Sequence, residues 1–210
     1  MIIDQILTAF KDHIESLGIH EYDLQDRYTV DITPDEFPFP NRGQNTINIY
    51  TDRTVKESLE KTARVYVPYI EICITRRVTR RGQDDHPTVV YLSQIKSLSN
   101  ILELIGIAID SNNSLLSNIN GIINSNKESI ATILDGIPSS NLAANVRTAQ
   151  TIGPVEITEF INRPIPRYDG FFTAYNSDRE PNPFQPEKVS GYSMKLRVKG
   201  PKFILSQVCG

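Results

Sequence analysis

The chain has 210 residues, with 22 basic and 25 acidic side chains and a formal net charge of -3 at pH 7. This balance excludes a protein that coats nucleic acid over its whole surface, although it leaves room for a local basic patch. Two cysteines, Cys73 and Cys209, are too few for a disulfide framework, and the apolar runs are too short to cross a bilayer. We therefore expect one domain over 1–210, made in a reducing cytoplasm and without a membrane segment.

The first residues predict a helix followed by a strand and a loop. Residues 2–17 carry apolar side chains at three- and four-residue spacing, which predicts an amphipathic helix, and Gly18 is placed to end it. Residues 28–32 have the pattern of a short strand. The stretch 33–43 predicts a proline-rich loop, because its three prolines lack N–H donors and hold their neighbours extended.

A second strand is expected next. Residues 46–50 alternate between apolar and polar side chains. After them, Asp52 or Thr54 is placed to cap a short helix that ends near Ala63.

A long hairpin over 64–92 is the most regular part of the predicted sheet. From 69 to 75, isoleucines alternate with Tyr69, Glu71, Cys73 and Thr75, which is typical of a half-buried strand. Turn-forming residues occupy 82–87, and the β-prone residues 88–92 then predict the returning strand.

The region 93–150 predicts a helical insertion, because the apolar period changes from two to three and four. One helix is expected to end near Asp110. The next apolar pairs lie in a serine- and asparagine-rich background, which predicts one or two helices broken near Gly121 or Ser125. A short helix that ends near Gln150 completes the insertion.

The last third predicts strands over 154–161, 170–175, 192–198 and 203–208, with a proline-rich loop over 176–188. The whole order predicts an α+β domain with a mainly antiparallel sheet, a long hairpin, an N-terminal amphipathic helix and a central Ser/Asn-rich helical region.

The sequence offers little for catalysis or metal binding. His13, His20 and His86 have no partner at metal-ligand spacing, and no phosphate-binding loop, dinucleotide fingerprint, nucleophile elbow or C-x-x-C motif occurs. Asp84 and Asp85 are adjacent and fit a solvated turn better than a pair of catalytic carboxylates. We therefore expect no enzyme activity, no metal and no cofactor.

The sharpest charged feature is a cluster of arginines with two aspartates close behind. Four guanidinium groups could bind phosphates or carboxylates, or they could simply keep an edge strand solvated. The mixed charges favour an interface with a second copy of the chain. The predicted interface residues are Arg76, Arg77, Arg80, Arg81, Asp84 and Asp85.

The order of elements resembles the neck and tail-completion proteins of tailed bacteriophages. The resemblance rests on the helix 2–17, the hairpin 64–92 with a helix behind it, and the late strands. It implies a structural virion protein, a tail terminator, head–tail connector or neck subunit, that is made in the host cytoplasm and forms a hexameric or dodecameric ring. Its partners would be copies of itself and other neck or tail proteins, with DNA only as cargo in the lumen. A tail or baseplate component and a non-viral protein-binding module stay open as alternatives.

Overall fold

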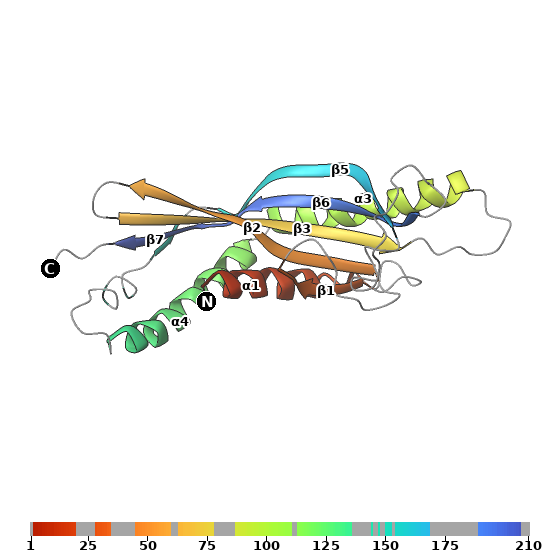
Figure 1. Ribbon diagram of the computed structural model, residues 1–210. Helices are drawn as coiled ribbons and strands as arrows, with labels where there is room; N and C mark the ends of the chain where they lie inside the picture. Colours follow the sequence, from red (N-terminus) through yellow and green to blue (C-terminus); the bar gives the residue numbers. More distant parts are fainter. Residues whose placement is uncertain are drawn as a thin grey trace, which may run out of the picture.

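The computed structural model has α+β architecture, with a mixed, mainly antiparallel sheet and helices against one of its faces (Figure 1). The structure describes residues 2–19, 28–34, 45–59, 63–77, 87–110, 113–135, 144, 147, 150–152, 154–168 and 189–206. The helices among these residues are α1 (Ile2–Ser16), α3 (Pro87–Asp110) and α4 (Asn113–Asp135). The strands are β1 (Tyr28–Ile32), β2 (Asn45–Leu59), β3 (Ala63–Arg77), β4 (Gln150–Ile152), β5 (Glu156–Tyr168), β6 (Val189–Lys199) and β7 (Lys202–Ser206).

The sheet is built around β2 and β3, which pair antiparallel over nearly their whole length. One half of the sheet has the order β1-β2-β3-β6-β5, with β1 parallel to β2 and the other neighbours antiparallel. In the other half β3 pairs with β7, and β7 pairs with β4. In Figure 1 the ends of β2, β3 and β7 project beyond α1 at the left of the view.

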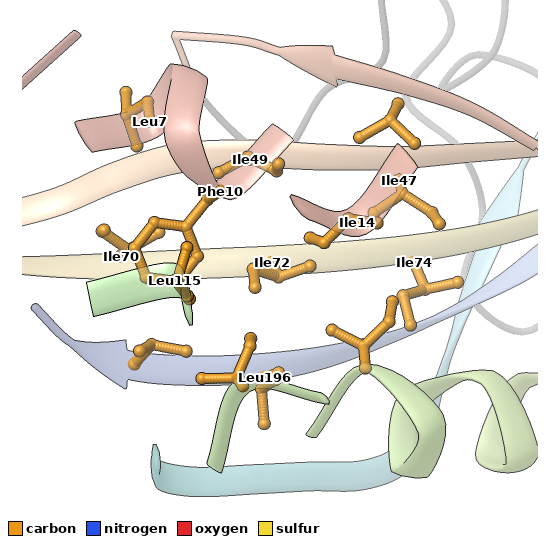
Figure 2. Packing of buried hydrophobic residues seen from close by; sticks show 14 of the residues in the cluster. Leu7, Phe10, Ile14, Ile47, Ile49, Ile70, Ile72, Ile74, Leu115 and Leu196 are labelled. Atoms are coloured by element: carbon orange, nitrogen blue, oxygen red, sulfur yellow. The ribbon is translucent and has the colours of Figure 1, made fainter. Parts of the chain in front are cut away.

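The core lies between the helices and one face of the sheet. Alternation along β3 turns Ile70, Ile72 and Ile74 to this face, where all three are buried. Neighbouring strands add Ile47 and Ile49 from β2 and Met194, Leu196 and Val198 from β6. Figure 2 shows several of these side chains meeting the apolar residues of the helices.

Helix α1 forms as its apolar spacing predicts. Ile6, Phe10 and Ile14 fall on one side of the helix and are buried against the sheet and α4. Gly18 has a φ of 61°, the left-handed conformation that ends many helices and that costs glycine little.

Helices α3 and α4 supply the rest of the apolar layer. Helix α3 begins at Pro87, where the missing N–H costs no helical hydrogen bond, and packs on β3, β5 and β6. Helix α4 buries Leu115, Ile119 and Ile123 and packs chiefly on α1. It runs without a break through Gly121 and Ser125, so the predicted interruption there was wrong.

Two predicted elements between 52 and 92 were also wrong. Residues 88–92 belong to α3 and not to a returning strand, so the hairpin over 64–92 does not form. Residues 52–59 continue β2 and do not form a capped helix. The long antiparallel pair of this protein is β2 with β3, which pair at thirteen positions. The stabilisation from this pairing exceeds the weak helix preference of residues 52–59.

Several predictions fall outside the described residues: the strand 170–175, the loop 176–188, and nearly all of the loop 33–43 and of the short helix before Gln150. Within the part of the chain that the structure describes, no helix has the length and apolar character needed to cross a membrane.

Candidate functional site

The sheet face turned away from the helices is polar and yet largely buried. Along β3 it carries Glu71, Cys73 and Thr75, which are at most 3% exposed. The buried polar residues of the neighbouring strands on this face are Thr46, Asn48, Ser193 and Arg167. Buried polar side chains of this kind need hydrogen-bond partners, so their contacts identify the site.

Four residues on four adjacent strands form a continuous row across this face, which we call the polar row. Tyr50 of β2 lies opposite Glu71 of β3, Glu71 opposite Arg197 of β6, and Arg197 opposite Glu159 of β5. Each member bonds to the next. The Tyr50 hydroxyl donates to Glu71 Oε2, Arg197 Nε donates to Glu71 Oε1 over 2.6 Å, and Arg197 Nη1 donates to Glu159 Oε2 over 2.7 Å.

Glu71 is the centre of the polar row. Its side chain is 4% exposed, and Lys195 Nζ adds a third donor 3.3 Å from Oε2. Burial alone would raise the pKa of Glu71. The hydrogen bonds from Tyr50 and Arg197 and the charge of Lys195 outweigh burial and hold that pKa below its ordinary value. Glu71 is therefore an ionised acceptor at neutral pH. The hydrogen bonds of Arg197 to Glu71 and Glu159 raise the pKa of Arg197.

A second polar group lies farther along the same face. The hydroxyls of Thr75 and Ser193 are 2.9 Å apart, and Arg167 Nε donates to Ser193 Oγ over 2.7 Å. These bonds tie β3, β6 and β5 together by side chains as well as by backbone.

A cleft of about 290 Å³ opens beside the polar row. Its lining residues are Asp52, Arg53, Tyr69, Ile70, Glu71, Thr158, Glu159 and Arg197. The strand register shifts on both sides of the cleft, between Thr51 and Arg53 in β2 and between Ile157 and Glu159 in β5. Such bulges redirect side chains, and here they place Asp52 and Thr158 at the cleft wall.

Arg53 differs from Arg197 in its contacts. Its guanidinium lies 4.7 Å from the centre of the Tyr69 ring, as in a cation–π interaction. Arg197, in contrast, contacts both Glu71 and Glu159. Arg53 is exposed and lies near the outer edge of β2, so its charge is available to a partner.

That outer edge of β2 is the second feature of the site. Strand β1 pairs only with the first part of β2, from Asn45 to Ile49. Beyond Ile49, no strand among the described residues pairs with the outer side of β2, although β2 continues to Leu59. Exposed strand edges carry unpaired N–H and C=O groups and readily accept another strand.

The predicted arginine cluster is only partly within the described residues. Arg76 and Arg77 end β3, opposite Tyr192 and Gly191 of β6, and Arg76 is half-buried. They therefore lie at the end of a central strand and not in a β-hairpin. Arg80, Arg81, Asp84 and Asp85 lie outside the described residues, so an interface role for the cluster stays a prediction.

Sequence reasoning missed the polar row, although one signal pointed to it. Alternation placed Glu71 in the middle of a strand of apolar and β-branched residues, where an acidic side chain needs partners. The register between β3 and β6 then supplies Arg197, more than a hundred positions away. Among the described residues, no group of three or more His, Cys, Asp or Glu side chains is arranged to hold a metal ion.

No family model matches the chain, and a search of curated proteins finds no sequence match.

Proposed function

We propose that this chain is a structural protein that acts by assembling with copies of itself. The observation that carries the proposal is the outer edge of β2, which continues for ten residues beyond the end of its pairing with β1. A strand edge of this length is a template for adding a strand from another chain. The exposed side chains beside it, Asp52 and Arg53, have opposite charges, which suits an ordered contact better than a surface that repels other edges.

The chemistry of the polar row supports a structural role over a catalytic one. Glu71 is the most deeply buried acidic group of the row, and both of its oxygens accept hydrogen bonds from Tyr50, Arg197 or Lys195. A general base needs a pKa near the working pH and an oxygen that faces the substrate. The lowered pKa of Glu71 and its occupied oxygens fit a buried group that joins β2, β3 and β6.

Within this class we propose a ring subunit at the head–tail junction of a tailed bacteriophage, as terminator, connector or neck protein. The N-terminal helix and the late strands that carry this resemblance are α1, β5, β6 and β7. The hairpin 64–92 no longer supports the resemblance, because 88–92 is helical. A ring of six or twelve copies in the virion would contact other neck or tail proteins and surround DNA in its lumen.

The native mass of the full chain tests the assembly proposal. Light scattering over a wide range of protein concentration should give a multiple of the monomer mass, and electron microscopy should show closed rings with a central opening. A monomer at every concentration, with no rings, would contradict the proposal and would favour a protein-binding module.

Binding to duplex DNA tests the role of DNA as cargo. Each phosphate contact contributes about -0.9 to the slope of log affinity against log salt. A lumen wall that lets DNA slide should bind weakly, with a slope near zero, as the net charge of -3 also suggests. Tight binding with a steep salt dependence would instead show that the protein binds DNA through several phosphate contacts.

A further inference from the structure

The backbone groups on the outer side of β2 can be identified from a single hydrogen bond on the opposite side of β3. Pro68 accepts a hydrogen bond from the N–H of Gly200, so its carbonyl points away from β2. Thr54 lies opposite Pro68. In an antiparallel ladder, the N–H and C=O groups of two opposite residues either both point toward the partner strand or both point away from it. The N–H and C=O of Thr54 therefore point to the outer edge.

The same alternation extends along the edge. Lys56 lies opposite Tyr66 and Ser58 opposite Arg64, two and four positions beyond Thr54. Their backbone groups therefore also point outward, whereas those of Val55 and Glu57 point to β3. The outer edge presents donors and acceptors at 54, 56 and 58, which is the spacing that another antiparallel strand requires.

From these positions we infer that the outer edge of β2 pairs with the same edge of a second copy, antiparallel and with Val55 on the two-fold axis. This register joins Thr54 of each copy to Lys56 of the other through backbone hydrogen bonds. It places Val55 opposite Val55, and position 53 opposite position 57. The inference rests on the self-assembly part of the proposed function and adds the partner, the strand and the register. A two-fold contact of this kind builds a dimer, so a ring would form from such dimers through a second contact.

Charge and shape favour a second copy as the occupant of the edge. Position 53 is arginine and position 57 is glutamate, so the register sets two pairs of opposite charge across the interface. Arg53 is exposed, and its guanidinium lies over the Tyr69 ring, where no described carboxylate bonds to it. The two-fold axis repeats the attraction between position 53 of one copy and position 57 of the other. The same edge is therefore complementary to itself, as an isologous contact requires.

Disulfide cross-linking tests the register. Val55 faces its own copy in a non-hydrogen-bonded pair, where Cα atoms are about 4.5 Å apart, within the range for a disulfide. The full-length variant Val55→Cys, in a Cys209→Ser background, should form a covalent dimer under mild oxidation. Thr54→Cys is the matched control, because in this register the two Thr54 Cα atoms lie farther apart than the roughly 7 Å limit for a disulfide.

Charge exchange tests the pairing of 53 with 57 without a covalent bond. Arg53→Glu should weaken association on the order of tenfold, because it turns two attractions into two repulsions. Adding Glu57→Arg should restore association. Circular dichroism should show that Arg53→Glu folds like the wild type, since position 53 is exposed. The same measurement on the double variant controls for folding.

The outcomes separate this inference from the proposed function. Assembly that persists while Val55→Cys fails to cross-link and the charge variants have no effect would overturn the β2 pairing and leave the assembly proposal standing. A wild-type chain that stays monomeric would overturn both. Equal cross-linking of Val55→Cys and Thr54→Cys would exclude this register.

Discussion

Gly200 donates its backbone N–H to the carbonyl oxygen of Pro68 over 2.8 Å, at the position where β3 exchanges β6 for β7 as its neighbour. Proline is rare in a central strand because it cannot donate to the ladder. Here the change of neighbour falls at the proline, so its missing N–H interrupts neither pairing. A Cβ atom on Gly200 would lie 2.8 Å from Cγ of Pro68 and 3.2 Å from its carbonyl oxygen.

Gly200→Ala should therefore destabilise the protein by about 1–3 kcal/mol, the usual range for overpacking. The cost should be smaller in a Pro68→Ala background, because the nearest obstructing atom is then absent. Denaturant unfolding of the four proteins in this double-mutant cycle gives the coupling energy. An equal cost in both backgrounds would show that the ring of Pro68 is not the obstacle.

Glu71→Gln should lower the free energy of unfolding at neutral pH by about 2–3 kcal/mol, because it leaves Arg197 and Lys195 facing a neutral amide. We place the loss near the lower end of the range for buried pairs, since Arg197 is 43% exposed and the amide still accepts hydrogen bonds. Glu159→Gln is the control. Glu159 is 49% exposed and bonds to Arg197 at the surface, so its loss should cost less than about 1 kcal/mol.

The pH dependence gives a second measurement on the same pair of variants. Because the native state lowers the pKa of Glu71 from 4.5, its contribution is complete above about that pH. It is lost as the pH falls below 4.5 and through the native value. The difference in stability between wild type and Glu71→Gln should therefore shrink in acid. A difference that is constant down to low pH would mean that the negative charge of Glu71 does not contribute to the free energy of unfolding.

The sequence alone predicts the elements whose signals are local. The apolar stripe of Ile6, Phe10 and Ile14 lies within one segment, so its spacing alone predicts α1. Gly18 predicts where this helix ends. The alternation of Ile70, Ile72 and Ile74 likewise predicts β3 without knowledge of its neighbours. Such elements can be predicted because the spacing of their own apolar side chains defines one buried face.

Elements that depend on distant partners were predicted wrongly. Residues 88–92 favour a strand by composition, but Pro87 starts a helix there and the buried stripe through Leu98 and Leu102 continues it. Residues 52–59 are too polar to show alternation and form a strand because β3 pairs with them. The polar row needs the register of four strands, which no single segment contains.

Cys73 should react with thiol reagents only when the sheet opens. Its side chain is fully buried, and its Sγ lies 3.9 Å from the hydroxyl of Thr75. In a Cys209→Ser background, labelling of Cys73 should be slower than labelling of the exposed site in Thr54→Cys by a factor on the order of a thousand or more. Rapid labelling of Cys73 in the folded protein would mean that the polar face opens without unfolding.

Two helical glycines allow a matched comparison of local packing. A Cβ atom on Gly121 in α4 would meet nothing within 4 Å, whereas on Gly106 in α3 it would lie 2.7 Å from the ring of Phe160. Alanine is favoured over glycine in a helix interior by about 1 kcal/mol. Gly121→Ala should therefore raise the free energy of unfolding by close to that amount.

Gly106→Ala should give less stabilisation or a net loss, because the Phe160 ring must move away from α3. Phe160 is 42% exposed, so the ring has room to move and the penalty should be modest. In a Phe160→Ala background the obstacle is gone, and Gly106→Ala should stabilise α3 about as much as Gly121→Ala stabilises α4. Thermal and denaturant unfolding of these variants measures both effects. If Gly106→Ala and Gly121→Ala stabilise the wild-type chain equally, the contact between Phe160 and α3 does not limit the packing of β5 on this helix.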